Sequence, residues 1–131
     1  MKIAAVTDDG TTISQHFGRA AYYSVLTVNN GQITNRELRD KVGHSHFAAQ
    51  EQGHDRGTPH GTGPEAQSRH TQMIDAIRDC QVLLARGMGW GARQGLEEAG
   101  IKAILTDIED IEVAVQAYLR GELADHPELL H

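Results

Sequence analysis

Short runs of apolar residues, separated by turn residues, predict strands in the first third of the chain. Residues 2–6 form a short run with four consecutive apolar residues at 3–6 and lead into Asp-Asp-Gly at 8–10, which predicts a buried strand ending in a tight turn. Residues 21–28 are rich in β-branched and aromatic types and predict a second strand. Asn-Asn-Gly at 29–31 is typical of a hairpin turn, so residues 32–38 are expected to form a third strand beside the second.

The second half of the chain alternates between helical and strand-like patterns. Apolar residues recur at helical spacing from Pro64 to about residue 79, which predicts a first helix. The patterns that follow predict a strand at 82–85, a helix at about 91–99 ending at Gly100, and a strand at 102–105. A last helix is predicted from its cap Asp107 to Arg120, ending at Gly121. Successive β-α units favour parallel pairing through right-handed crossovers. We therefore predict an α/β fold, a mixed sheet with helices on its faces, in the element order β-β-β-α-β-α-β-α.

The length of the chain and the distribution of its apolar residues indicate one domain. The 131 residues suit a single core, which we assign to residues 1–121. Within this domain, a His- and Gly-rich segment at about 41–64 is expected to form a flexible loop. A loop of this length is uncommon in a compact domain, so it is either functional or disordered. The tail at 122–131 is expected to fray.

Composition and charge exclude several classes of protein. The net charge is −6 and no run of Lys or Arg forms a basic patch, which argues against nucleic acid as a partner. No apolar stretch is long enough to span a membrane. Cys80 is the only cysteine, so the chain can form neither an internal disulfide nor a cage of thiolate ligands. We expect a protein of the reducing cytoplasm.

The first candidate binding segment lies between the first two strands. His16, Phe17, Gly18 and Arg19 form a short polar and aromatic block there. A neutral imidazole is the commonest protein ligand of metal ions, and glycine allows a ligand to approach the backbone closely. Alternatively, His16 caps the loop and Arg19 pairs with a carboxylate.

The second candidate segment follows the strand at 82–85. Gly87, Gly89 and Gly91 alternate here with two large apolar residues, Met88 and Trp90. Glycines after a parallel strand and before a helix can turn backbone N–H groups toward an anion. The spacing is not that of the dinucleotide fingerprint, and tight packing of the strand against the helix is an adequate alternative. A ligand or partner could cover Met88 and Trp90.

The His-rich loop is a third candidate site. His44 and His46 can place two imidazoles on one side of an extended chain, and a His-rich tract is typical of metal binding by composition. The alternative is a solvated linker that binds metal only adventitiously. If the loop binds specifically, the protein would be a partner protein that responds to a divalent metal.

An enzymatic function is less well supported by the pattern. Asp8 and Asp9 end the first strand, where a metal-dependent nuclease could hold an acidic ligand. Two-metal hydrolysis needs several converging carboxylates, and the later strand ends do not complete such a set. No arrangement of nucleophile and base can be recognised from spacing. We expect a protein without catalytic residues.

Four segments together resemble a known family. MKIAAVTDDG, SQHFGRAAYYSVLTVNNG, LLARGMGWGARQGLEEAGIKAI and AVQAYLRGEL resemble the dinitrogenase iron-molybdenum cofactor-binding family, which includes nitrogenase-cofactor carrier proteins and the orange protein. The resemblance covers nearly the whole chain outside 41–69. It implies a ribonuclease-H-like fold.

The resemblance also implies a function in cofactor biosynthesis. It points to non-covalent carriage or insertion of an iron-molybdenum cofactor or a related metal–sulfur cluster. A cofactor-assembly or nitrogenase-like protein would then be the partner. The segments 16–20 and 88–92 are expected to form the ligand cleft, because backbone N–H groups and Arg19 suit an anionic cluster and His16 suits an exposed metal. His44 and His46 enter only as loop candidates.

Overall fold

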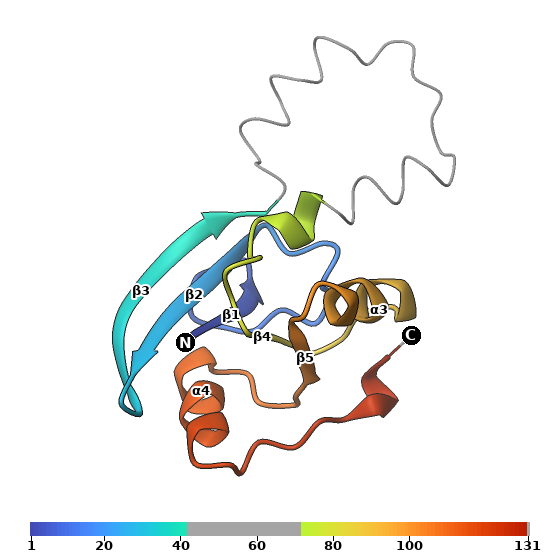
Figure 1. Cartoon of the computed structure of the whole chain (residues 1–131). Helices are drawn as coiled ribbons and strands as arrows, with labels where there is room; N and C mark the ends of the chain where they lie inside the picture. The colour runs from blue at the N-terminus through green and yellow to red at the C-terminus, as the bar shows by residue number, and fades with distance from the viewer. Residues whose placement is uncertain (42–71, 131) are drawn as a thin grey trace, which may run out of the picture.

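The computed structural model describes residues 1–41 and 72–130, which form a five-stranded mixed sheet with helices packed on it (Figure 1). The strand order is β3-β2-β1-β4-β5. The strands lie at β1 Lys2–Thr7, β2 Tyr22–Asn29, β3 Gln32–Asp40, β4 Val82–Ala85 and β5 Lys102–Leu105. All five were expected from the hydrophobic pattern, and their bounds differ from the expected ones by two residues at most.

The central strand β1 has one antiparallel and one parallel neighbour. It pairs antiparallel with β2 on one side and parallel with β4 on the other, and β4 pairs parallel with β5. Residues 3–6 of β1 are fully buried, as expected for a strand covered on both faces. Because β1, β4 and β5 run in the same direction, their carboxyl ends lie at one edge of the sheet.

The hairpin between β2 and β3 has the backbone that its sequence predicts. Asn30 and Gly31 have φ values of 52° and 76°, so both occupy the left-handed region that this tight turn requires. Asparagine and glycine adopt that region at low cost, and β2 therefore turns directly into its antiparallel neighbour β3.

Helices cover both faces of the sheet. The hydroxyl of Tyr23 in β2 donates to the carbonyl of Met73, so the helical segment at 72–75 lies on the face that Tyr23 occupies. Arg36 of β3, opposite Leu26 of β2, points to the other face and pairs with Glu112 of α4 (Ile111–Leu119). Side chains alternate between faces along a strand, which places these two helical elements on opposite sides.

The helix α3 (Trp90–Glu98) packs on the same face as the segment at 72–75. A Cβ atom added to Gly95 would lie 2.9 Å from Cδ1 of Ile74, so the two elements touch at that glycine. Gly100 and Gly121, with φ values of 83° and 74°, follow the ends of α3 and α4 as the sequence predicted.

The start of the last helix differs from the prediction. Asp107 was expected to cap it, but the N-cap is Asp110, whose side chain accepts a hydrogen bond of 3.0 Å from the amide of Val113. The reason is tertiary. Ile13 donates to the carbonyl of Glu109 at 2.7 Å, and Asp110 forms a bridge with Thr12, so the helix begins only after Asp110.

The C-terminal tail was expected to fray, but the structure attaches it to the domain. Asp125 accepts a hydrogen bond from the amide of Leu105, and the amide of His126 donates to the carbonyl of the same residue, at 2.9 and 2.8 Å. The short helix η1 (Pro127–Leu129) follows, and Leu130 forms a parallel bridge with Met88. The tail therefore continues the fold along the edge where β4 and β5 end.

Some predictions lie outside the described residues. These are the loop expected at about 41–64 and the first part of the helix expected from Pro64, together with His44 and His46.

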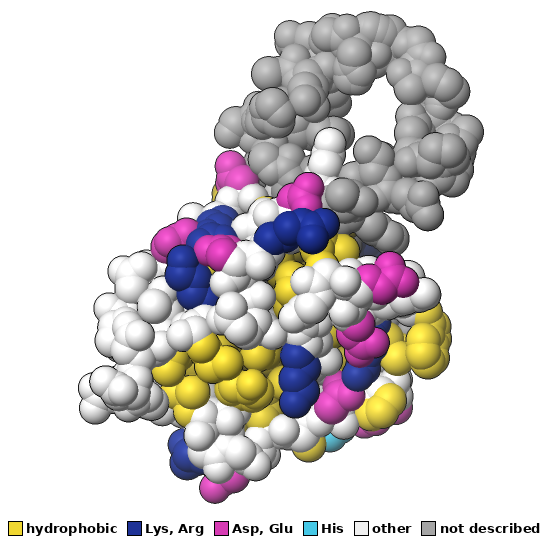
Figure 2. Space-filling view, viewed as in Figure 1, with side chains coloured by type: hydrophobic (Ala, Val, Ile, Leu, Met, Phe, Trp, Pro, Cys, Tyr) yellow, Lys and Arg dark blue, Asp and Glu magenta, His cyan; other side chains and the backbone are white. Residues whose placement is uncertain are grey.

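Among the described residues, no helix has the length and apolar character needed to cross a bilayer. Positive and negative side chains intermingle on the face shown in Figure 2, beside an apolar area near α4.

Candidate functional site

Two loops that the sequence singled out lie side by side at the carboxyl ends of β1 and β4. The amide of Phe17 donates to the carbonyl of Gly87 at 3.1 Å, and the amide of Arg86 donates to the carbonyl of Ser14 at 2.9 Å. These two backbone contacts join the loop after β1 to the loop after β4. They arise because β1 and β4 are parallel neighbours, and the carboxyl edge of such strands is the usual ligand position in open α/β sheets.

An open cleft of about 440 Å³ lies at this junction. Its volume is within the range of sites for small ligands, about 300–1,000 Å³. The residues that line it come from the loops after β1, β4 and β5 and from the tail: Gln15, His16, Arg86, Gly87, Asp107, Glu128, Leu129 and Leu130. Two of the expected site residues, His16 and Gly87, are therefore brought together in one cleft.

The charged groups of the cleft have both signs. Arg86 lies 3.6 Å from Glu109, and the imidazole of His126 lies 2.9 Å from Glu128 and 3.8 Å from Asp107. Hydrogen bonds from its own backbone amide and from His126 lower the pKa of Glu128, so this carboxylate stays charged at neutral pH. One wall of the cleft is thus acidic, and Arg86 supplies a cation beside it.

The described residues of the cleft do not form a closed metal cage. Within residues 1–41 and 72–130, no group of three or more His, Cys, Asp and Glu side chains is arranged to hold a metal ion. His16 is exposed and could supply one nitrogen ligand to a metal that other atoms of the ligand already coordinate.

The other expected site residues are placed in different ways. Phe17 and Met88 are 2% and 1% exposed, so their side chains belong to the core. Gly18 and Arg19 are exposed in the loop after β1, and Trp90, at the start of α3, is 69% exposed. None of these five residues lines the cleft. A role for them in ligand binding stays a prediction.

The start of α3 has the backbone expected of the glycine-rich segment. Gly89 is the N-cap, and no side chain of the described residues caps the helix or places an acid in its first turn. The N–H groups near Trp90 and Gly91 therefore keep the partial positive charge of a helix N-terminus, which favours anions.

A buried lysine, which sequence reasoning missed, supports the loop after β1. Lys41 is 2% exposed, and its Nζ donates to the carbonyl of Phe17 and lies 4.6 Å from the centre of the Phe17 ring. Burial lowers the pKa of Lys41 to about 8, and the negative charge of Asp8 partly opposes this shift. No local pattern marks Lys41, because its position depends on β3 ending beside the loop.

Other residues of the cleft were also missed. Arg86 and Asp107 come after the parallel strands β4 and β5, and the rule that such strands end at one edge could have found them. The tail residues Glu128, Leu129 and Leu130 carry no comparable signal, since only the attachment of the tail brings them to the cleft.

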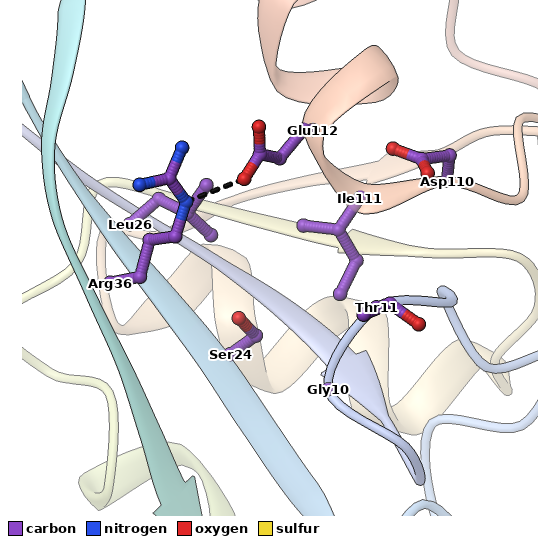
Figure 3. Close-up of a pocket in the computed structure, with 8 residues that line it drawn as sticks. All are labelled: Gly10, Thr11, Ser24, Leu26, Arg36, Asp110, Ile111 and Glu112. Atoms are coloured by element: carbon purple, nitrogen blue, oxygen red, sulfur yellow. Dashed lines mark hydrogen bonds and ion pairs between the residues drawn. The ribbon is translucent and has the colours of Figure 1, made fainter.

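A second, smaller hollow of about 180 Å³ lies between β2, β3 and α4 (Figure 3). Ser24 and Leu26 form its floor, Ile111 faces them from α4, and the ion pair of Arg36 with Glu112 crosses it. Among the described residues that line the hollow, Arg36 is the one cation and is paired with Glu112, and Asp110 adds a negative charge, so the hollow is poorly suited to an anionic ligand. The cleft at the strand ends is the better candidate.

The attachment of the tail can be tested at Asp125. Replacing Asp125 with alanine leaves the buried amide of Leu105 without its partner and removes the ion pair with Arg93, which measures 2.7 Å. We expect the free energy of unfolding to fall by about 1–3 kcal/mol, measured by urea denaturation, and C-terminal proteolysis to accelerate. Glu122→Ala is the control, because Glu122 makes only an exposed pair with Arg120. Equal proteolysis of the two variants would contradict the attachment.

Comparison with known proteins assigns the chain to a family. The family model described as "Dinitrogenase iron-molybdenum cofactor" matches residues 1–121. A protein of Methanocaldococcus jannaschii that is named only as uncharacterized is 25% identical over 124 residues, which cover 94% of this chain and 89% of that protein.

Solved structures share the fold. The apo form of the orange protein from Desulfovibrio gigas has a TM-score of 0.65 at 24% identity, covering 95% of this chain and 92% of that one. A putative dinitrogenase from Methanocaldococcus jannaschii has a TM-score of 0.61 at 12% identity, covering 96% and 94%. A putative NifB protein from Thermotoga has a TM-score of 0.60 at 20% identity, covering 95% and 91%. Since the family model spans all but the last ten residues, the chain belongs to the dinitrogenase iron-molybdenum cofactor family.

Proposed function

We propose that the protein binds an iron-molybdenum cofactor or a related metal–sulfur cluster in the cleft between His16 and Gly87, and carries it without chemical conversion. The family suggests association with such a cofactor. The observation that carries the proposal is the backbone contact between the loops after β1 and β4, which brings the exposed His16 and the backbone of Gly87 into one open cleft with Arg86.

The chemistry of the cleft suits such a cargo. Histidine nitrogen is a good ligand for an exposed iron or another borderline metal. Metal–sulfur clusters are anionic, and the guanidinium of Arg86 provides a compensating charge within the cleft. Arg19 and the uncapped start of α3 add positive potential nearby, although they do not line the cleft.

The acidic wall would orient the cargo. Asp107 and Glu128 disfavour sulfide atoms on their side of the cleft, because like charges repel. The anionic face of a cluster would therefore turn toward Arg86 and the loops, with the metal edge nearest to His16.

Further parts of the proposal concern partners and the cell. We infer delivery to or from a cofactor-assembly protein or a nitrogenase-like protein, as the family and its NifB-like structural neighbour suggest. The reducing cytoplasm suits a chain whose single cysteine, Cys80, is buried. The alternative, a divalent-metal partner protein, depends on His44 and His46 outside the described residues, and the family match does not favour it.

We extend the inference to the class of fold. The sheet order β3-β2-β1-β4-β5, with a β-meander followed by parallel strands, supports a ribonuclease-H-like architecture. The order of the described elements is consistent with β-β-β-α-β-α-β-α, whose first helix lies largely outside the described residues.

The proposal can be tested by anaerobic titration with isolated iron-molybdenum cofactor, followed by gel filtration and metal analysis. Iron and molybdenum should elute with the protein. His16→Ala should weaken binding at least about tenfold, because a coordinating nitrogen is lost. Asn35→Ala is the matched control, since Asn35 is exposed on β3 at the far side of the sheet from β5. If neither metal elutes with the unmodified protein, this cargo is excluded.

A further inference from the structure

Lys41 occupies an unusual place for a charged residue. Lysine side chains are almost never fully buried unless they are paired, yet Lys41 is 2% exposed. Its backbone amide donates to the carbonyl of Ala21 at 3.1 Å, which attaches the end of β3 to the start of β2. The side chain is thereby directed beneath the loop after β1.

The ammonium group makes its contacts with that loop and with β2. Nζ donates to the carbonyl of Phe17, and it lies 4.6 Å from the ring centre of Phe17 and 5.6 Å from that of Tyr23. Asp8, whose carboxylate accepts from the amide of Ala21 at 2.9 Å, contributes a favourable charge. Lys41 is thus bonded at the centre of the loop whose two ends are held by Asp8 and Ala21.

The bonded carbonyl of Phe17 lies inside a tight turn of the loop. The amides of Arg19 and Ala20 both donate to the carbonyl of His16, at 3.2 and 3.1 Å, which closes a tight turn around Phe17 and Gly18. Lys41 thus bonds to a carbonyl inside the turn that carries His16, Gly18 and Arg19, while the amide of Phe17 donates to Gly87.

We propose that Lys41 is a positioning residue, which holds the loop after β1 through the Phe17 carbonyl so that His16 faces the cleft in its binding orientation. The inference rests on the proposed function, in that the ligand is the metal–sulfur cargo of the same cleft. Packing alone does not account for the residue, because a methionine of similar length would fill the space without burying a charge.

The test compares two variants of neighbouring buried residues. Lys41→Met removes the bond to the Phe17 carbonyl and keeps the volume. Tyr23→Phe removes the hydrogen bond of 2.9 Å from the Tyr23 hydroxyl to Met73 and leaves the Phe17 carbonyl untouched. Affinity for isolated iron-molybdenum cofactor and the midpoint of thermal unfolding are measured for both.

Lys41→Met should bind the cofactor about tenfold more weakly, which is the loss expected when a group that orients a metal ligand is removed. The thermal midpoint of Lys41→Met should be no lower than that of Tyr23→Phe. Tyr23→Phe should bind like the unmodified protein. If affinity instead follows the thermal midpoint in both variants, Lys41 has only a structural role and the proposal is overturned.

A second measurement needs no ligand. Amide hydrogen exchange at Arg19 and Ala20 should become at least about tenfold faster in Lys41→Met and should be unchanged in Tyr23→Phe, because only the first variant frees the loop. Unchanged exchange in both would overturn the proposal. If the unmodified protein fails to bind the cofactor, the proposed function fails, while this exchange result still decides whether Lys41 fixes the loop.

A third measurement uses the unmodified protein and covers the case in which Lys41→Met does not fold. A scalar coupling across the hydrogen bond between the Lys41 Nζ and the Phe17 carbonyl carbon should be detectable by nuclear magnetic resonance at pH 6. Rapid solvent exchange of the ammonium protons with no such coupling would overturn the proposal.

Discussion

Replacing Phe17 with alanine is expected to lower the free energy of unfolding by about 3–5 kcal/mol, as for other fully buried aromatic residues. The ring is 2% exposed, and its centre lies 6.3 Å from that of Tyr23 at an interplanar angle of 50°. It also lies under the ammonium group of Lys41. The alanine variant would lose this packing and leave a cavity at the base of the loop after β1. Urea denaturation at pH 7 measures the loss.

Phe17→Leu is the matched control, because leucine keeps most of the apolar volume and loses only the aromatic contacts. It should cost roughly a third as much as Phe17→Ala. A loss below about 1 kcal/mol in the alanine variant would mean that the ring is not part of the core. The sequence suggested Phe17 as a ligand-binding residue, and the structure indicates that its side chain contributes by supporting the loop.

The unfolding free energy should also rise with pH between about 8 and 10.5 through Lys41. Burial lowers the pKa of Lys41 from 10.5 to about 8 in the folded protein. In this window the unfolded chain binds the proton more strongly than the folded one, so raising the pH favours the folded state. The shift corresponds to about 3 kcal/mol of stability that is missing below pH 8 and is recovered by pH 10.5.

Two other buried groups, Cys80 and Tyr23, lower the unfolding free energy as the pH rises. Burial raises the pKa of Cys80 to about 11 and raises that of Tyr23 above its usual value. Their folded forms hold the proton longer than their unfolded forms, so the stability they contribute declines as the pH rises above about 9. The contribution of Lys41 is therefore best isolated by comparing the unmodified protein with Lys41→Met at each pH.

As the pH rises from 7 to 10, the unfolding free energy of the unmodified protein should increase relative to that of Lys41→Met. Guanidinium denaturation at half-unit intervals of pH provides the values. The two chains differ only at Lys41, so Cys80 and Tyr23 cancel in the difference. A difference that stays constant across this range would show that Lys41 titrates as an exposed lysine does.

Most elements of the fold could be predicted because their signals are local. The apolar run at 3–6, the turn at Asn30 and Gly31, and the glycines at 100 and 121 each report the backbone of their own segment. The prediction was wrong where a distant segment decided the outcome. Asp107 resembles a helix cap, but bonds from the loop after β1 to Glu109 and Asp110 delay the start of the helix to Ile111.

The candidate site could be predicted only in part. Parallel pairing of β1 with β4 brings His16 and Gly87 together. The strand and helix patterns predicted parallel pairing only within the second half of the chain, and the resemblance to the family implied that the two segments form one cleft. The orientations of Phe17 and Met88 could not be predicted, since an aromatic or thioether side chain in a loop can face either a ligand or the core. Here the core of the domain takes both.

The sequence by itself determined the strands, the hairpin and the C-terminal ends of the helices, and its resemblance to the family indicated the two loops of the cleft. Only the tertiary structure decided that the tail forms a wall of the cleft, that Asp107 and Glu128 make this wall acidic, and that Lys41 bonds to Phe17. The physical reason is the range of the interactions. Propensities and turn geometry act within a few residues, whereas Lys41 and Phe17 are 24 residues apart, and Leu105 and Asp125 are 20 apart. Such contacts form only when the sheet brings their segments together.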